Sequence, residues 1–316
     1  MSDVEAPQVD SLSDQPGKLT RGDLMTLTKF RLSTLVIVTT FVGFWLNRGP
    51  ILNLTLLMHT LIGSTLAAFG ASVFNQLMEI EPDKRMKRTA DRPLPARRIE
   101  PGVAFAMGWL LSAFALIHLA KMVNTEAAVL CAITLAVYLF IYTPMKQQSA
   151  WNTIVGAVSG ALPPLIGWAG AVGAQTNDST YFRLELITSA GAIYLFLLLF
   201  LWQLPHFLAI NWMYRDEYLK GGFVMWANDD ASGRKTSKLA LIFSFCTMSL
   251  ALIPPLSGHT SMWFLPLALL INVGLIFLAW QFYIARDRVS ARKLFFYTLF
   301  YLPLMLGLSM IFWRQV

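Results

Sequence analysis

The sequence predicts an all-α protein, a bundle of about nine helices that cross a membrane. Its 316 residues are 56% hydrophobic and 14% charged, whereas soluble domains have roughly 45–50% and about 25%. The apolar residues also gather in runs long enough to cross a bilayer, which takes about 20 helical residues. Nothing in the chain follows the alternating pattern of transmembrane β-strands. These observations exclude an ordinary soluble protein.

Nine apolar segments are the candidate spans. They lie at 29–46, 55–78, 102–121, 126–143, 151–172, 184–211, 239–257, 262–282 and 294–313. The polar residues before them lack the apolar core of a cleavable secretory signal. We therefore expect residues 1–27 to be a disordered cytoplasmic tail and residues 28–316 to form one transmembrane domain.

The distribution of Lys and Arg predicts the orientation, because loops on the cytoplasmic side are enriched in basic residues. With the N-terminus inside, 21 of the 25 Lys and Arg residues fall in inside segments. An even number of spans would spoil this partition, so we expect a cytoplasmic N-terminus and an outside C-terminus. The net charge of +7 then faces anionic lipid at the membrane surface. No nucleic-acid motif accompanies it.

An acid-rich loop follows the second span. Asn75, Glu79 and Asp83 are spaced four residues apart, so on a continuous helix their oxygen atoms would follow one slowly winding face. Such oxygen ligands suit magnesium, although a solvated helix end with mixed charges is the plainer interpretation. Pro82 should kink or end the helix near Glu81.

Three arginines, Arg85, Arg88 and Arg92, surround these acids. A guanidinium group binds phosphate oxygens in bidentate fashion, so arginines beside metal-binding carboxylates suit a diphosphate. Membrane topology alone explains the basic residues but not the acids interleaved with them.

A second inside loop, after the sixth span, repeats the theme. His206 lies at the inner end of the span, and Asp216 and Glu217 follow it. A histidine in an apolar run is more often a hydrogen-bonded core residue than a ligand, and both interpretations stay open here. We expect Asp229 and Asp230, farther along, to be solvated. Transporters also show such internal symmetry, so the repeat does not by itself select an enzyme.

Together the two loops resemble the aspartate-rich motifs of the UbiA superfamily of intramembrane prenyltransferases. The stretch DKRMKRTADRPLPARRI, which begins at Asp83, and WQLPHF, which begins at Trp202, are similar to stretches of the protoheme IX farnesyltransferase (heme O synthase) family within it. A third similar stretch, YTPMKQQSAWNTIVGAVSGALPPLIGWAG, begins at Tyr142. The likeness covers most of residues 28–225.

The chain departs from the family pattern at a few positions. Glu79 replaces an aspartate, which keeps the charge on a longer arm, and Pro82 replaces an aliphatic residue. Phe30 stands in place of a proline, and Gln147 and Gln148 follow Lys146 where the family has Arg and then Thr nearby. Because no departure removes a carboxylate, we expect activity to persist.

The resemblance implies an enzyme that transfers a farnesyl group from farnesyl diphosphate to a vinyl group of heme b, giving heme O, with Mg2+ as cofactor. It implies one magnesium ion at Asn75, Glu79 and Asp83, and another at Asp216 and Glu217. His206 would face the heme, as an axial ligand or a propionate partner. The residues implied to contact substrates are Lys29, Arg31, Arg85, Arg88, Arg92, Tyr142, Lys146, Asn152 and His206.

Two alternatives remain. One is a related enzyme that prenylates a quinone or another aromatic precursor, and the other is a transporter or non-catalytic heme carrier. The acids lie at one membrane face rather than at mid-bilayer, which favours an enzyme. The resemblance also implies a bacterial inner membrane location with a cytoplasmic active-site mouth. Heme A synthase or oxidase assembly proteins would be partners.

Overall fold

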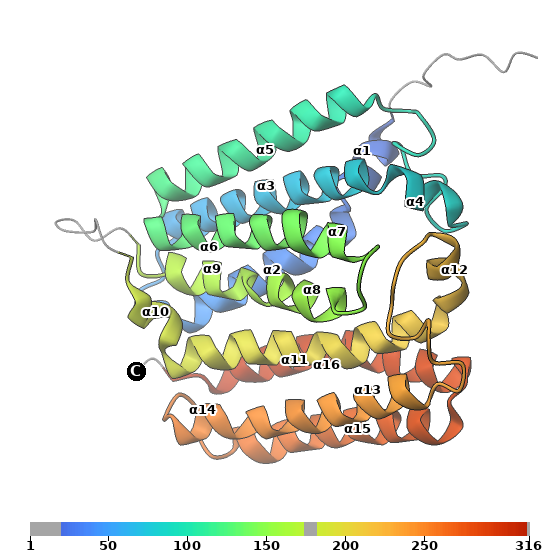
Figure 1. Ribbon diagram of the computed structural model, residues 1–316. Helices are drawn as coiled ribbons and strands as arrows, with labels where there is room; N and C mark the ends of the chain where they lie inside the picture. Colours follow the sequence, from blue (N-terminus) through green and yellow to red (C-terminus); the bar gives the residue numbers. More distant parts are fainter. Residues whose placement is uncertain (1–19, 174–181, 315–316) are drawn as a thin grey trace, which may run out of the picture.

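The structure is a computed structural model that describes residues 20–173 and 182–314. In this part of the chain, eight helices are long and apolar enough to cross a membrane, or nine if the bent pair α1 (Arg21–Leu27) and α2 (Phe30–Leu46) forms one span. The long helices lie side by side in one bundle (Figure 1). The prediction of an all-α bundle with about nine spans is confirmed.

Each remaining span is one helix or a series of short consecutive helices. The unbroken ones are α3 (Leu54–Met78), α5 (Pro101–Met122), α15 (Phe264–Ala285) and α16 (Arg288–Phe312). The composite ones are α6 (Thr125–Ala136), the π-helix η1 (Val137–Tyr142) and α7 (Thr143–Met145); α8 (Asn152–Ala161) and α9 (Pro163–Gly170); α10 (Leu184–Thr188) and α11 (Ala190–Met213); and α13 (Arg234–Ser249), the 3-10 helix η2 (Leu250–Leu252) and α14 (Ile253–Leu256). Two short helices, α4 (Ile80–Arg85) and α12 (Arg215–Lys220), lie at one end of the bundle (Figure 1).

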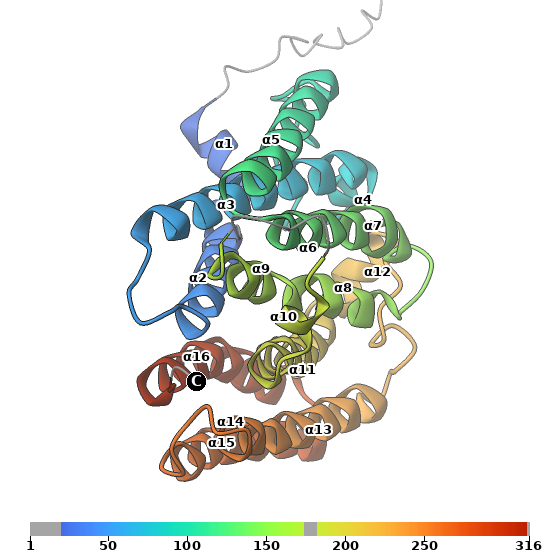
Figure 2. The ribbon, with the colours of Figure 1, turned by 90° about the vertical axis from the view of Figure 1, so that its left-hand side faces the viewer.

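Helices α2 and α9 pack backbone against backbone in the interior (Figure 2). A Cβ atom at Gly43 would lie 1.9 Å from the carbonyl oxygen of Pro164, and one at Gly167 would lie 1.8 Å from that of Thr40. Neither distance is possible for a real side chain. Small residues permit such close approach between membrane helices, and here they fix α9 beside the cavity described below.

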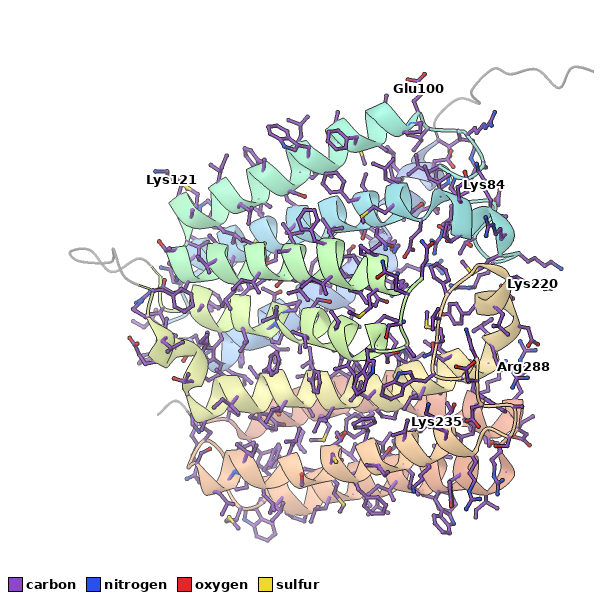
Figure 3. The ribbon with its side chains drawn as sticks, viewed as in Figure 1. Lys84, Glu100, Lys121, Lys220, Lys235 and Arg288 are labelled. Atoms are coloured by element: carbon purple, nitrogen blue, oxygen red, sulfur yellow. The ribbon has the colours of Figure 1, made fainter. Side chains whose placement is uncertain are left out.

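The basic loops gather at one end of the bundle, which we call the basic end. Lys84, Lys220, Lys235 and Arg288 lie there, whereas Lys121 lies at the opposite end (Figure 3). Helices α4 and α12 are also at the basic end (Figure 1). The two acid-rich loops are therefore on the same side of the bundle, as the sequence predicts.

The expected disordered tail is wrong for its described part, because residues 21–27 form α1. Thr20 caps this helix in a reciprocal hydrogen-bonded box with Asp23. Arg98 holds the Asp23 carboxylate at 2.8 Å, and Leu27 is buried in a small apolar cluster. These contacts offset the entropy lost on ordering the segment. Residues 1–19 of the predicted tail lie outside the described residues.

The helix break after the second span comes earlier than the sequence predicts. Helix α3 ends at Met78 and α4 begins at Ile80, whereas Pro82 predicted a break near Glu81. A proline ring clashes with the carbonyl four residues earlier, and here that carbonyl belongs to Met78, the last residue of α3. Pro82 itself lies in the first turn of α4, where a missing N–H is tolerated.

Candidate active site

A cavity of about 390 Å³ opens between α2, α3, η1, α8 and α11. Leu135, Ile166 and Leu199 contribute to its mainly apolar lining, and Lys29 and Lys146 add charge. Its size lies within the range of about 300–1,000 Å³ that is usual for ligand pockets. The cavity can therefore enclose an apolar chain while its charged residues hold a polar head.

The π-helix η1 shapes one wall of this cavity. Tyr138 and Tyr142 both line it, with their ring centroids 5.3 Å apart. The Nζ atom of Lys146 lies 4.5 Å from the Tyr142 ring centroid, which is close enough for a cation–π interaction. Short π-helical turns inside α-helices are frequent at functional sites.

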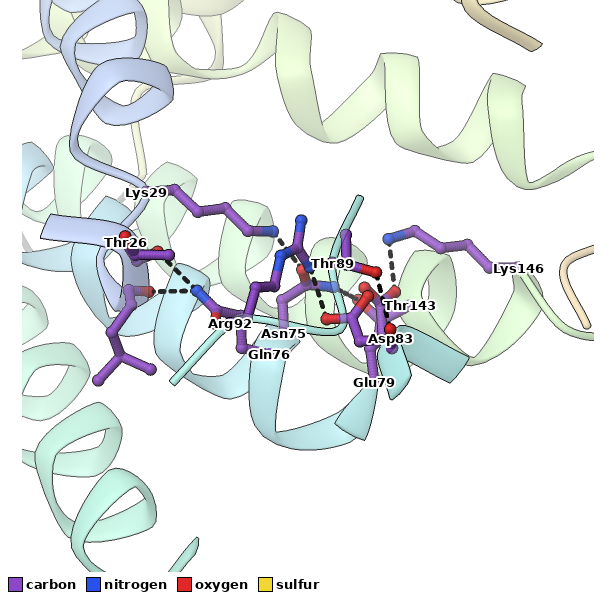
Figure 4. A network of polar contacts seen from close by, with 11 residues as sticks. Thr26, Lys29, Asn75, Gln76, Glu79, Asp83, Thr89, Arg92, Thr143 and Lys146 are labelled. Atoms are coloured by element: carbon purple, nitrogen blue, oxygen red, sulfur yellow. Dashed lines mark hydrogen bonds and ion pairs between the residues drawn. The ribbon is translucent and has the colours of Figure 1, made fainter. Parts of the chain in front are cut away.

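Asn75, Glu79 and Asp83 come together at the basic end and face basic side chains from other segments (Figure 4). Glu79 and Asp83 are 4% and 1% exposed, so their charges need partners. The contacts are Lys29 Nζ to Asn75 Oδ1, Lys146 Nζ to Glu79 Oε1 at 2.6 Å, and Arg92 Nη1 to Asp83 Oδ2 at 2.6 Å. The break between α3 and α4 does not separate the three predicted ligands.

The two carboxyl groups experience opposite electrostatic environments. Burial alone would raise the pKa of Glu79, but the charges of Lys146 and Lys29 hold it below its ordinary value. Burial raises the pKa of Asp83, and Arg92 offsets only part of this rise. The Oδ1 atom of Asp83 is buried and has no hydrogen-bond partner. Asp83 is thus the carboxylate with unused binding capacity.

These residues fit a hard cation. Within residues 20–173 and 182–314, no group of three or more His, Cys, Asp or Glu side chains is arranged to hold a metal ion. The candidate set is instead two carboxylates and one amide oxygen. Magnesium suits such a set, because it takes oxygen ligands, keeps several waters and shares the phosphates of a substrate. The unpartnered oxygen of Asp83 is a ready ligand.

The second acid-rich loop is less enclosed. The side chain of Asp216 is 82% exposed and lies 3.6 Å from that of Arg215. Glu217, by contrast, has a buried Oε2 atom without a hydrogen-bond partner. The structure therefore separates the two acids of the predicted second metal site by their surroundings, and only Glu217 resembles Asp83.

Helix α12 packs against the first acid-rich loop through Tyr218. Its ring lies 6.1 Å from that of Phe223, in an apolar cluster that also contains Met86. Burial raises the pKa of Tyr218, and the nearby Arg88 charge counteracts this rise. The two loops that the sequence singled out thus touch each other.

The other predicted substrate residues differ in position. Arg31, Arg85 and Arg88 are exposed, and the guanidinium carbon of Arg88 lies 5.5 Å from the ring centroid of Tyr214. None of these arginines is among the residues that line the cavity in the described part of the chain. They lie at the basic end, outside the cavity itself.

Asn152 forms hydrogen bonds that connect two segments of the backbone. Its Nδ2 atom donates at 2.7 Å to the carbonyl oxygens of Ser149 and Val224. This bond ties the start of α8 to the loop after α12. Val224 also donates its N–H to the carbonyl oxygen of Lys146 at 2.7 Å, so the loop holds the backbone that carries the Glu79 partner.

The expectation that Asp230 is solvated is wrong. Asp230 is 6% exposed, and its Oδ2 atom accepts a hydrogen bond from the N–H of Thr236 at 2.7 Å. Burial alone would raise its pKa, but this bond helps to hold the pKa below its ordinary value. The carboxylate satisfies a backbone N–H that the first turn of α13 would otherwise leave unpaired.

Sequence reasoning missed several polar residues around the site. Asn75 Nδ2 donates to Thr143 Oγ1 at 3.2 Å, and Thr89 Oγ1 donates to the carbonyl oxygen of Asp83 at 3.0 Å. His206 lines the cavity and bonds to Thr298 on the last span. Thr89 lies in a recognised motif, but Thr298 has no neighbouring signal in the sequence.

The chain matches the UbiA prenyltransferase family over residues 36–302. It is 37% identical to protoheme IX farnesyltransferase of Solibacter usitatus, over 92% of this chain and 98% of that protein. It is 40% identical to the protein of the same name from Opitutus terrae, over 90% of this chain and 92% of that protein. A structure of a UbiA homologue from Archaeoglobus fulgidus bound to GPP and Mg2+ superimposes on this chain with a TM-score of 0.66 and 13% sequence identity. The superposition covers 91% of this chain and 99% of that one.

Proposed function

The chain belongs to the UbiA prenyltransferase family, and we propose from this premise that it farnesylates heme b to give heme O. It is a transferase and an integral membrane protein. Heme b is proposed as the acceptor because the chain is similar, over almost its whole length, to proteins named protoheme IX farnesyltransferase. The mainly apolar cavity, whose lining includes the cationic Lys29 and Lys146, supplies the matching physical setting.

The reaction joins farnesyl diphosphate, heme b and water. The bond between C1 of the farnesyl group and the diphosphate oxygen breaks, and the electron pair leaves with diphosphate. The vinyl group of heme b then forms a carbon–carbon bond to C1, and water adds to the resulting cation with loss of a proton. The apolar walls around Leu135 and Leu199 would shield the allylic cation from premature attack by water.

We assign the diphosphate to the basic side chains beside the acids. Arg92 and Lys146 already lie within ion-pair distance of the acids, at 2.6 Å from Asp83 and Glu79. A diphosphate that competes for these cations would release carboxylate oxygens for a metal. Lys29 lines the cavity and bonds to Asn75, so it can also bind phosphate. Arg88 would act from outside the cavity.

Magnesium is the proposed cofactor, held by Asn75, Glu79 and Asp83. When bound, it supplies positive charge that stabilises the departing diphosphate. The free Oδ1 of Asp83 supports this assignment, as does a UbiA homologue bound to GPP and Mg2+. We propose a second magnesium at Asp216 and Glu217, with Glu217 as its principal ligand, because the Glu217 Oε2 atom is buried without a partner whereas Asp216 is largely exposed.

The concentration of basic residues at one end supports a cytoplasmic active-site mouth. On this orientation the N-terminus is cytoplasmic and the C-terminus outside, and the membrane would be a bacterial inner membrane. The product is membrane-bound, so heme A synthase or oxidase assembly proteins are the proposed recipients.

Product analysis tests this function. Membranes that contain the protein are incubated with heme b, farnesyl diphosphate and Mg2+, and the extracted hemes are separated and weighed by mass spectrometry. We expect a farnesyl-hydroxyethyl heme that disappears with a chelator and returns with added Mg2+. If the heme is unchanged and an aromatic quinone precursor is prenylated instead, the protein is a prenyltransferase with a different acceptor. If neither acceptor is prenylated, the protein is a non-catalytic heme carrier.

A further inference from the structure

His206 lies in the cavity wall with one ring nitrogen already engaged. It is on α11, in the middle of a stack whose ring centroids lie 5.3 Å away at Trp202 and 5.0 Å away at Phe295. Its Nδ1 atom is 2.8 Å from Oγ1 of Thr298, which is fully buried on α16. The neighbouring rings and this bond hold the imidazole in one orientation.

The Thr298 hydroxyl decides which nitrogen of His206 carries the proton. A threonine hydroxyl has one proton to donate. Thr298 Oγ1 lies 2.6 Å from the carbonyl oxygen of Phe295, and a carbonyl can only accept, so the hydroxyl proton must lie between these two oxygens. Towards His206 the hydroxyl is therefore an acceptor. His206 must donate from Nδ1, because the reverse arrangement would place two oxygen lone pairs against each other at 2.6 Å.

The other nitrogen, Nε2, is consequently unprotonated in the neutral ring. Within residues 20–173 and 182–314, no hydrogen bond reaches this atom, while His206 lines the cavity. With Nδ1 engaged by α16, Nε2 is the ring nitrogen left to serve a ligand there. A lone pair in this position can bind a metal ion or accept a proton. It cannot donate to a carboxylate.

Trp202 helps to hold Thr298, the residue that sets this tautomer, in place. Its indole Nε1 donates to the carbonyl oxygen of Thr298 at 2.7 Å. Trp202 and His206 are four residues apart on α11, so they share one face of the helix. Both therefore contact Thr298, one through its backbone and the other through its hydroxyl.

We propose that Thr298 is a positioning residue that holds His206 as the Nδ1–H tautomer, so that Nε2 binds the iron of the heme substrate. Metal-binding histidines characteristically donate their other ring N–H to an acceptor that fixes ring orientation. This arrangement favours an iron ligand over a hydrogen-bond donor to a heme propionate. The inference rests on the proposed function, because it takes heme b as the acceptor whose iron reaches His206 in the cavity wall.

Heme binding without turnover tests the inference. Ferric heme b is titrated into the purified protein without farnesyl diphosphate, and absorption and resonance Raman spectra report the iron ligands. We expect a nitrogen-ligated heme, lost in His206→Ala and restored by added imidazole. Thr298→Val, which removes the acceptor at similar volume, should weaken heme binding by about tenfold, whereas Thr298→Ser should stay within about twofold of the original protein.

A matched control is Thr247→Val on α13. Thr247 is also buried, and its hydroxyl bonds only to the Phe243 carbonyl one turn earlier. This variant should bind heme like the original protein. Equal heme affinity and equal spectra in Thr298→Val and the original protein would overturn the positioning role of Thr298.

A second measurement needs no variant at Thr298. The chain has four histidines, so nitrogen NMR of ¹⁵N-histidine-labelled protein, with His206→Ala as the difference spectrum, can assign the His206 signals. We expect a protonated Nδ1 and an unprotonated Nε2, and a protonated Nε2 in the neutral ring would overturn the tautomer. Farnesylated heme formed by a protein whose bound heme lacks a nitrogen ligand would reject this inference and leave the proposed function intact. Absence of any farnesylated heme would reject the proposed function itself.

Discussion

Two buried ion pairs lie at opposite ends of the bundle, and they differ in how fully their atoms are used. At the end away from the basic loops, both oxygens of Glu126 accept hydrogen bonds from the Arg183 side chain, at 2.6 and 3.0 Å. At the basic end, Glu79 binds Lys146, but the adjacent Asp83 leaves one buried oxygen without a partner. A satisfied pair is suited to hold the fold, whereas an incompletely satisfied network is suited to bind a ligand.

The difference also appears in the number of segments involved. Arg183 bonds to Glu126 and to the carbonyl oxygen of Gly173, so it joins α6 to the segments at either side of residues 174–181. The basic-end network draws its cations from the α1–α2 junction, the loop after α4 and the end of α7 (Figure 4). A diphosphate placed among these cations would contact several elements at once.

The largest expected effect is on Asp83. Asp83→Asn should lower heme O formation by on the order of 10³-fold, because a carbonyl oxygen and an amide replace the carboxylate that binds magnesium. Heme O is quantified by mass spectrometry under matched protein concentrations. Asp91→Asn is the control in the same loop, since the side chain of Asp91 is 95% exposed, and it should retain full activity.

Asp83→Asn should also leave the metal-free protein at least as thermally stable as the original. The folded-state pKa of Asp83 lies above its ordinary value of 3.8, so ionisation above that pKa costs folding free energy. A neutral amide avoids this cost. A lower unfolding temperature together with lost activity would make Asp83 a structural residue.

The next effect concerns the satisfied pair. Arg183→Met should destabilise the protein by about 3 kcal/mol, because it leaves the buried Glu126 carboxylate without its partner. Thermal unfolding in detergent measures the loss, and the double variant with Glu126→Gln should recover most of it. Heme O formation per folded molecule should change by less than about twofold. A larger loss of heme O formation per folded molecule would show that the Glu126–Arg183 pair is not purely structural, contrary to the contrast drawn between the two ends.

A pH effect should distinguish the two carboxylates of the basic end. Protons and magnesium compete for Asp83, whose pKa is raised, whereas the lowered pKa of Glu79 keeps that group ionised. The Mg2+ concentration that gives half the maximal rate should therefore increase as the pH falls. Because the pKa of Asp83 is raised, this increase should begin at a higher pH than it would for an aspartate with an ordinary pKa. Once Asp83 is mostly protonated, this Mg2+ concentration should increase by at most about tenfold for each unit by which the pH falls. The rate at saturating Mg2+ should depend less on pH, and a constant half-saturating concentration would contradict the role of Asp83.

The sequence predicted the spans well because membrane helices must be long and apolar, and these features are local. It also singled out Asn75, Glu79 and Asp83 as candidate ligands, and these side chains lie together despite the break after Met78. It could not reveal that Lys29 and Lys146 neutralise this motif from distant segments. Such partners depend on packing rather than on neighbouring residues.

The same limit explains two residues whose roles were misjudged or missed. Asp230 lies in a loop with a solvated composition, yet its buried carboxylate accepts a hydrogen bond from the N–H of Thr236 in the first turn of α13. Thr298 lies in an apolar span, and its contacts with Trp202 and His206 join it to residues more than 90 positions away in the chain. Local patterns carry no information about either contact.

The smallest expected effect separates the two acids of α12, which the sequence treats as equivalent. Glu217 has a buried, unpartnered oxygen like Asp83, whereas Asp216 is largely exposed. We expect Glu217→Gln to raise the Mg2+ concentration for half-maximal rate by about tenfold, and Asp216→Asn by about twofold, because water screens an exposed carboxylate. The proportion between these changes is the informative result. Equal and large effects would establish both acids as magnesium ligands, and α12 would then have to turn Asp216 inward when substrate binds. Two negligible effects would confine the metal chemistry to the buried network of Asn75, Glu79 and Asp83.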